Sequence, residues 1–246
     1  MFLGELAINL LAALLGFLAS RLYLYLKEYY SKRNLRWFWV PPDAKKINLY
    51  CGRREEQLLL NEGEVEPLIN LQDALSMAEL KSFLDQFYSE VIIVFEEAGI
   101  DWTYPVISLG GPLVNSLTKQ VGEQNLLPLW FLDLPYTKDS KRSIGDKNRT
   151  EVFKSAFNGD ELISDVGLVA RMKYPKFPQT YLFVLASNYG TGTHGIIKYL
   201  TSTKKLDELH SMCKKNNSTY FQAIIQTYTS RNRIVDAERL RFKKLE

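Results

Sequence analysis

Residues 180–200 read TYLFVLASNYGTGTHGIIKYL, and this stretch decides the fold class. Its first half is a short apolar run, which is typical of a strand buried on both faces of a sheet. Its second half opens on Gly190, Gly192 and Gly195, spaced as G-x-G-x-x-G, and continues as a helix. A buried strand that turns through glycines into a helix is the repeating unit of an α/β protein.

The same alternation of strands and helices extends over residues 46–230. Residues 133–160 are rich in Lys, Asp, Ser, Gly and Asn, and we expect mostly an exposed loop there. The order predicts a Rossmann-like, mostly parallel three-layer sandwich with an antiparallel C-terminal extension. Strands are expected at 46–51, 104–109, 127–132, 165–172, 181–186 and 219–229. Helices are expected at 73–98, 112–121 and 205–214, and directly after the G-x-G-x-x-G turn.

The N-terminus differs from the rest of the chain because residues 2–26 are almost continuously apolar. A helix that spans a membrane needs about 20 such residues. The first five residues carry no positive charge, which favours a retained helix over a cleaved signal peptide. Basic residues follow the apolar run and none precedes it, which predicts a cytoplasmic body. The basic residues are Arg21, Lys27, Lys32, Arg33 and Arg36.

These features predict three parts. Residues 1–30 form a transmembrane helix, residues 31–45 a membrane-proximal linker, and residues 46–246 a cytosolic ligand-binding domain. The protein would be a single-pass protein of the inner or cytoplasmic membrane, with lipid as a partner. The Pro41-Pro42 pair is expected to end the helix.

Small and polar residues follow one side of the N-terminal helix. Glu5, Asn9, Gly16 and Ser20 align along this side, with Ala12 or Ala13 between them. Small residues let two helices approach closely, and polar ones can form hydrogen bonds between helices. This face therefore predicts helix self-association and a homo-oligomer. Alternatively, Glu5 lies among lipid headgroups at the end of the span.

Composition argues against several classes of function. The 246-residue chain has a formal net charge of +3, which is too small to favour binding of duplex nucleic acid. Its two cysteines, Cys51 and Cys213, and its two histidines, His194 and His210, make no metal-ligand pattern. We therefore expect no metal and no cofactor, and reduced thiols in a cytosolic compartment.

Two glycine turns follow predicted strands, at residues 109–116 (LGGPLVNS) and 187–194 (SNYGTGTH). In an open α/β sheet, ligands bind outside the carboxyl ends of the strands, and a helix N-terminus favours phosphate. A NAD site is disfavoured because no acidic residue ends a following strand, and a Walker loop is excluded because no Gly-Lys-Ser/Thr follows. Tight turns without a ligand remain an alternative. The predicted ligand-binding residues are Gly110, Gly111, Asn115, Asn188, Gly190, Thr191, Gly192, Thr193 and His194.

The two turns also carry a resemblance to known families. The motifs Gly110-Gly111-Pro112-x-x-Asn115 and Gly190-x-Gly192-Thr193, with Asp165-x-Gly167-Leu168-Val169-x-Arg171 between them, resemble a Rossmann-like domain of prokaryotic S-layer-like proteins. Residues 188–194 are similar to the Asn-x-Thr-Gly-Gly-Thr-Lys loop of CRISPR-associated Rossmann-fold (CARF) sensors, although His194 replaces the lysine and the glycines are not adjacent. The resemblance implies a sensor of a nucleotide or cyclic oligonucleotide in a membrane-perturbing effector of antiviral defence.

The sequence gives less support for an enzyme than for a ligand-binding protein. His194 and Asp165 are candidate catalytic residues that a serine such as Ser108 or Ser187 would complete, but no G-x-S-x-G motif exposes either serine. The favoured hypothesis is a non-enzymatic sensor. A membrane-anchored nucleotide or phosphoester hydrolase and a non-catalytic structural module are the alternatives.

Overall fold

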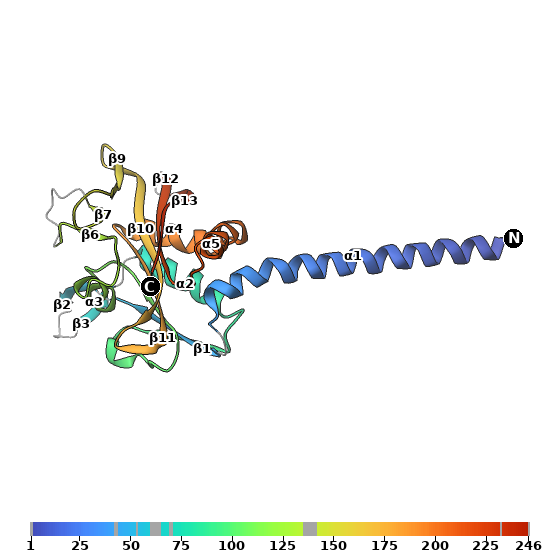
Figure 1. The fold of residues 1–246 in the computed structure, drawn as a ribbon, viewed down its shortest axis with the longest axis horizontal. Helices are drawn as coiled ribbons and strands as arrows, with labels where there is room; N and C mark the ends of the chain where they lie inside the picture. Colours follow the sequence, from blue (N-terminus) through green and yellow to red (C-terminus); the bar gives the residue numbers. More distant parts are fainter. Residues whose placement is uncertain are drawn as a thin grey trace.

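A computed structural model describes residues 2–41, 44–52, 54–59, 65–68, 71–134, 142–231 and 233–245, and within them all side chains except those of 2–13, 27–28, 30–34, 54–59 and 65–68. A mixed α/β body carries one long helix, α1 (Phe2–Trp39), which projects away from it (Figure 1).

A large mixed sheet forms the middle of the body, with strand order β13-β12-β10-β11-β5-β1-β4 and β9 added beside β10. The pairs β11–β5, β5–β1 and β1–β4 are parallel, whereas β9, β10, β12 and β13 pair antiparallel to their neighbours. The bounds are β1 (Lys46–Cys51), β4 (Glu90–Val94), β5 (Val106–Leu109), β9 (Ala156–Asn158), β10 (Glu161–Tyr174), β11 (Phe177–Ser187), β12 (Phe221–Ser230) and β13 (Arg233–Lys244).

The predicted mostly parallel sheet is therefore wrong. A tight turn at residues 174–177 joins β10 to β11, and a turn this short can connect only antiparallel neighbours. β10 then lies between β11 and β12, so the antiparallel part is half of the sheet rather than a C-terminal extension.

Two predicted segments have a different structure. The helix expected at 73–98 is α2 (Leu71–Leu84) followed by β4 and the short 3-10 helix η1 (Glu97–Gly99), because the β-branched run in EVIIV favours a strand beside β1. The loop expected at 133–160 contains further strands. They are β7 (Ser143–Gly145), β8 (Val152–Lys154) and β9, and the first two form a small sheet with β6 (Trp130–Leu132). Elsewhere in the chain, β2 (Arg54–Leu59) pairs antiparallel with β3 (Val65–Leu68).

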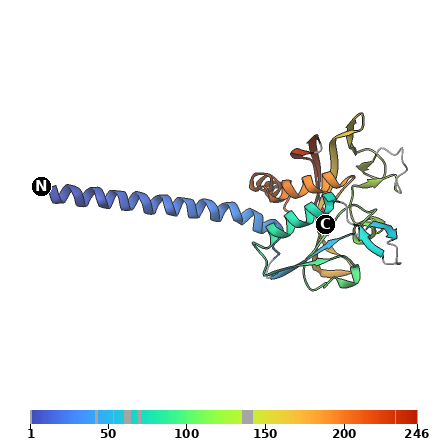
Figure 2. The ribbon, with the colours of Figure 1, turned by 180° about the vertical axis from the view of Figure 1, so that it is seen from behind.

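Both faces of the large sheet are covered. Alternate residues of β11 point to opposite faces, so that Phe183 and Leu185 lie in one core and Leu182 and Val184 in the other. Helices α2, α4 (Gly190–Thr201) and α5 (Thr203–Lys215) cover the first face, and Figure 2 shows α2 beside α4. The helix α3 (Ser116–Glu123) and the β6–β7–β8 sheet cover the second.

The last turn of α1 is part of the first core. Phe38 and Trp39 are fully buried, and Trp39 Nε1 donates a hydrogen bond to the carbonyl of Leu200 (3.2 Å). The buried Arg171 donates from Nη1 to the carbonyl of Trp37 (3.0 Å). The root of α1 is therefore fixed to the body by burial and by hydrogen bonds.

Within the part of the chain that the structure describes, none of the helices combines the length and the apolar character that crossing a membrane requires. The transmembrane helix predicted at residues 1–30 is therefore wrong, and with it the predicted location in the inner or cytoplasmic membrane. α1 continues to Trp39, and charged residues recur along it from Arg21 onward. The apolar run is consequently shorter than the helix that contains it.

Candidate functional site

The two glycine turns lie side by side at the carboxyl ends of β5 and β11. The backbone N–H of Gly110 donates to the carbonyl of Leu185 (2.9 Å). A Cβ atom on Gly111 would lie 2.9 Å from the carbonyl oxygen of Ser187, so only glycine fits between the turns without a shift. The close approach of the two turns follows from the parallel pairing of β5 with β11.

The first turn is held by its own polar side chains. Asn115 is buried and caps α3, with Oδ1 accepting from the N–H of Thr118 and from Ser108 Oγ (2.9 Å each). Its Nδ2 donates to the carbonyl of Leu109 (2.9 Å), and Thr118 Oγ1 donates to the carbonyl of Gly110 (3.0 Å). The amide of Asn115 therefore has partners within the chain on both of its polar atoms.

In the second turn, a carboxylate of the chain itself lies at the N-terminus of α4. Asp165 is fully buried on β10, and its Oδ2 accepts from the N–H groups of Tyr189 and Gly192 (3.0 Å each). Its Oδ1 accepts from the N–H of Val166 (2.8 Å) and from Ser155 Oγ (2.7 Å). Burial raises the pKa of Asp165 to about 7, although these four hydrogen bonds act to lower it. Asp165 thus takes the position in which a helix N-terminus binds an anion.

The glycines of this turn allow close packing. A Cβ atom on Gly192 would lie 2.7 Å from Cγ of Asp165, and one on Gly195 would lie 2.7 Å from Cβ of Thr227. Both distances are below those that carbon atoms tolerate. Thr193 also points inward, with Oγ1 2.9 Å from Ser187 Oγ. The second and third glycines of the G-x-G-x-x-G pattern are thus accounted for by the contacts of α4 with β10 and β12.

The two candidate catalytic residues face different partners. His194 Nε2 lies 2.7 Å from Glu79 Oε2 on α2, whereas the carboxylate of Asp165 bonds to β10 and the turn. Among the described residues, no cluster of His, Cys, Asp or Glu is arranged to hold a metal ion. Asn188 is buried, with Nδ2 donating to Ser155 Oγ (3.1 Å), and Gly190 and Thr191 are half-buried. The role of these residues in ligand binding stays a prediction.

The predicted association face of α1 is described only in part. The side chains of Glu5 and Asn9 lie outside the described residues. A Cβ atom on Gly16 would meet nothing within 4 Å, and Ser20 Oγ donates to the carbonyl of Phe17 (3.2 Å). Self-association through these four residues stays a prediction.

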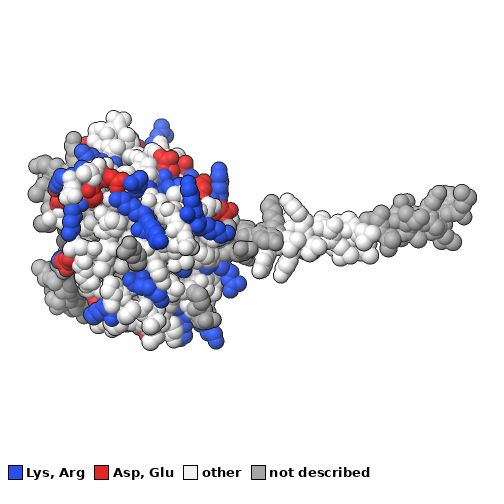
Figure 3. All heavy atoms as spheres, viewed as in Figure 1, with Lys and Arg blue, Asp and Glu red and all other residues white. Residues whose placement is uncertain are grey.

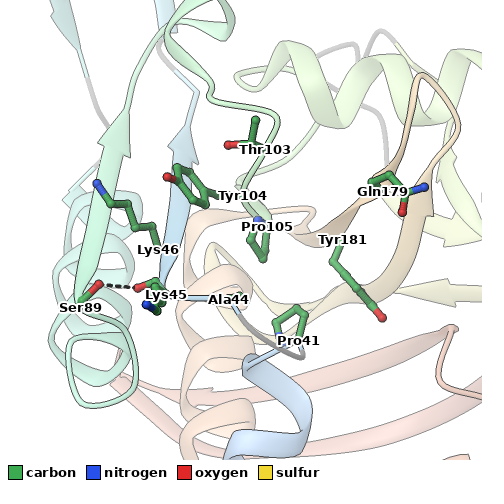
Figure 4. A pocket seen from close by; sticks show the side chains of 10 residues that line it. All are labelled: Pro41, Ala44, Lys45, Lys46, Ser89, Thr103, Tyr104, Pro105, Gln179 and Tyr181. Atoms are coloured by element: carbon green, nitrogen blue, oxygen red, sulfur yellow. Dashed lines mark hydrogen bonds between the residues drawn. The ribbon is translucent and has the colours of Figure 1, made fainter.

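An open pocket of about 350 Å³ lies at the opposite edge of the sheet, at the amino ends of the parallel strands. In Figure 4, Tyr104 and the two lysines lie on one side of the opening, Tyr181 and Gln179 lie on the other, and Pro105 lies between. Its walls are formed by Pro41, Ala44, Lys45, Lys46, Ser89, Thr103, Tyr104, Pro105, Gln179 and Tyr181.

Among the described residues that line this pocket, two are lysines and none is a carboxylate. Lys46 Nζ lies 2.5 Å from Glu90 Oε2 and 5.8 Å from the centre of the Tyr104 ring, and its hydrogen bond with Glu90 raises the pKa of Lys46. Lys45 is exposed and has no carboxylate partner among the described residues. On the other side, Lys173 Nζ and the guanidinium carbon of Arg171 lie 3.9 and 5.5 Å from the centre of the Tyr181 ring.

The pocket also touches the connection between α1 and β1. Pro41 and Ala44 come from this connection, and the N–H of Ala44 donates to the carbonyl of Pro41 (3.3 Å). Ser89, which precedes β4, donates from both its N–H and its Oγ to the carbonyl of Lys45 (2.9 and 2.8 Å). A molecule in this pocket would therefore contact the root of α1 and the sheet together.

Sequence reasoning missed this pocket because it looked for a ligand at the carboxyl ends of the strands. The available signals were the lysine pair directly after the prolines and a tyrosine at or near the start of two strands. Models of known protein families give no match to this chain, and no curated protein matches it. The observations that bear on function are therefore the geometries of the carboxyl and amino edges of the large sheet.

Proposed function

We propose that this protein is a non-enzymatic sensor whose pocket at the amino edge of the sheet binds a small phosphate-bearing ligand with a planar ring, such as a nucleoside monophosphate. One observation carries the proposal. Lys45, Lys46, Tyr104 and Tyr181 line a single pocket whose wall includes the connection to α1. Ammonium groups attract phosphate as point charges, and aromatic faces stack on planar rings.

Lys45 is the side chain that we assign to the phosphate. The ammonium group of Lys46 already pairs with Glu90. Lys46 therefore contributes to the phosphate site through its contact with the Tyr104 ring and its positive potential, and not as an unpaired charge. The pocket volume of about 350 Å³ lies at the lower end of the range for small-molecule sites, about 300–1,000 Å³. This size favours a mononucleotide over a cyclic oligonucleotide as the ligand of a single copy.

The output of the sensor would be the stability of the junction between α1 and the body. A ligand shifts a conformational equilibrium only when it contacts the two states differently. Because Pro41 and Ala44 line the pocket, a bound ligand would interact with one arrangement of the α1–β1 connection in preference to others. Since the last turn of α1 is buried and hydrogen-bonded in the body, occupancy would change how firmly this turn is held.

The test is thermal unfolding and isothermal titration of the full chain with adenosine 5′-monophosphate, with inorganic phosphate as a second probe. At 100 times its dissociation constant, a ligand adds about 2.7 kcal/mol to the free energy of unfolding. The variant Lys45→Ala removes a charge-assisted contact worth about 1.5–3 kcal/mol, so we expect it to weaken binding by roughly 10- to 150-fold. The matched control is Lys198→Ala, which removes the same charge from an exposed position on α4.

Binding that both lysine variants weaken equally would contradict the assignment, because it would reflect net charge alone. Absence of binding by either probe would favour a structural module. No described contact favours the hydrolase alternative, since His194 pairs with Glu79 and the carboxylate of Asp165 is bonded to the turn and to β10.

A further inference from the structure

The projecting part of α1 exposes large apolar side chains to solvent. Between residues 14 and 29, ten Leu, Phe and Tyr side chains are 41–66% exposed. In Figure 3 the body is covered with charged side chains, whereas the described part of α1 is almost free of them. If each side chain exposes roughly 100 Å², the helix presents on the order of 1,000 Å² of apolar surface. The largest such patch on a typical monomer is about 300–600 Å².

One face of this helix follows a heptad pattern. Leu15, Leu18, Leu22, Tyr25 and Tyr29 recur at alternating spacings of three and four, which are the a and d positions of a coiled coil, and all five are exposed. No charge interrupts the seam, because Arg21 falls at the flanking g position. Gly16 and Ser20 of the predicted association face fall at b and f, so this seam is a different face.

We infer that α1 is an assembly helix whose occupant is α1 of a second copy of this chain, paired parallel and in register along the seam of Leu15, Leu18, Leu22, Tyr25 and Tyr29. In this arrangement each seam residue packs against the same residue of the second copy. The leucines form three layers, and the tyrosines form the two layers nearest the body. The five seam residues expose on the order of 500 Å² in each copy, so pairing two copies would bury roughly 1,000 Å² in total, which is about the least that a specific interface takes. The inference is independent of the proposed ligand.

The first experiment measures the mass of the full chain in solution by light scattering after gel filtration. Leu22 and Leu24 are 59% and 57% exposed on the same helix, but only Leu22 lies on the seam. We expect the wild type and Leu24→Glu to be dimeric, and Leu22→Glu to dissociate to monomer with an unchanged melting temperature of the body. A monomeric wild type, or equal behaviour of the two variants, would overturn the inference.

A second experiment tests the direction of pairing. Cys51 and Cys213 are both buried, so an added surface cysteine is the reactive one. Leu15→Cys should form a disulfide-linked dimer under mild oxidation, because a parallel pair in register places residue 15 beside its copy. An antiparallel pair would place residue 15 near residue 29, and Leu15→Cys would then stay monomeric on a non-reducing gel. Leu24→Cys is the control, and cross-linking of both variants at the same rate would contradict the parallel seam.

Discussion

Replacing Gly195 by alanine tests whether the glycines of the 190–195 turn serve packing. A Cβ atom at this position would lie 2.7 Å from Cβ of Thr227 and closer still to Oγ1 and Cγ2 of the same side chain. Thr227 is fully buried on β12. α4 packs against α2 on one side and against the sheet below it, so a shift away from Thr227 would disturb other contacts.

The expected change in the free energy of unfolding is the balance of two opposing effects. Glycine to alanine inside a helix stabilises by about 1 kcal/mol when the new methyl group has space. Carbon atoms pack at about 3.5–4.0 Å, so the new methyl group forces a shift of roughly 1 Å or more in a close-packed region. Overpacking of this kind costs about 1–3 kcal/mol and at times more. The two effects leave a net loss of about 0–2 kcal/mol. Because the new Cβ atom would overlap with Oγ1 of Thr227, we expect Gly195→Ala to lower the free energy of unfolding by an amount at the upper end of this range, about 2 kcal/mol.

The assay is urea unfolding of the full chain, followed by circular dichroism. Gly16→Ala is the matched control, because it places the same methyl group on a helix where nothing lies within 4 Å. The control should not destabilise the protein. Thr227→Ala should recover part of the loss in the double variant, because it removes the two closest atoms, and Oγ1 of Thr227 has no hydrogen-bond partner among the described residues. A Gly195→Ala protein as stable as the wild type would refute the packing explanation.

Two further predictions concern the buried polar groups of the turns. Asn115→Ala should lower the free energy of unfolding by about 1–2 kcal/mol, measured in urea, because it removes the cap of α3; a loss below about 0.3 kcal/mol would contradict this role. Burial raises the pKa of Asp165 to about 7, above its value of about 3.9 in an unfolded chain, so its contribution to stability should fall as pH rises from about 4 to 7 and stay constant above. Asp165→Asn should flatten that slope in urea titrations between pH 5 and 8, and an equal slope in both proteins would show that another group titrates.

Buried strands were largely predictable from the sequence. The apolar runs at 165–172, 181–186 and 219–229 correspond to parts of β10, β11 and β12, because a strand covered on both faces leaves a continuous local signature. The N-cap at Asn115 was not predicted, because the helix was expected to begin at Pro112, whereas α3 begins at Ser116.

The partners of strands were not predictable in the same way. Apolar positions at helical spacing continue from α2 into residues 90–94, and only the long-range pairing with β1 makes that segment a strand. The pairing of β10 with β12 likewise depends on contacts between residues 50 to 64 positions apart. The spacing of apolar residues along the chain carries no information about such contacts.

The candidate sites also depend on long-range contacts that the sequence does not reveal. The sequence indicated a helix N-terminus suited to an anion, but it did not reveal that Asp165, more than 20 positions earlier, occupies it. The amino-edge pocket is built from four separate stretches of chain, none of which carries a recognisable motif alone. When segments that are distant in the sequence form a site, the sequence shows only weak signals of it, such as the lysine pair at 45–46.

The two edges of the sheet differ in what a ligand would have to displace. At the carboxyl edge, an anion at the N-terminus of α4 would compete with a carboxylate that already accepts four hydrogen bonds. Displacing it would leave Asp165 buried without partners, which is among the most costly changes in a protein interior. At the amino edge, a ligand would enter an open space beside Lys45 and replace water. Since that space also touches Pro41 and Ala44, a ligand there would contact the connection to α1 directly, whereas a ligand at the carboxyl edge would be linked to α1 through the length of α4, whose Leu200 accepts a hydrogen bond from Trp39.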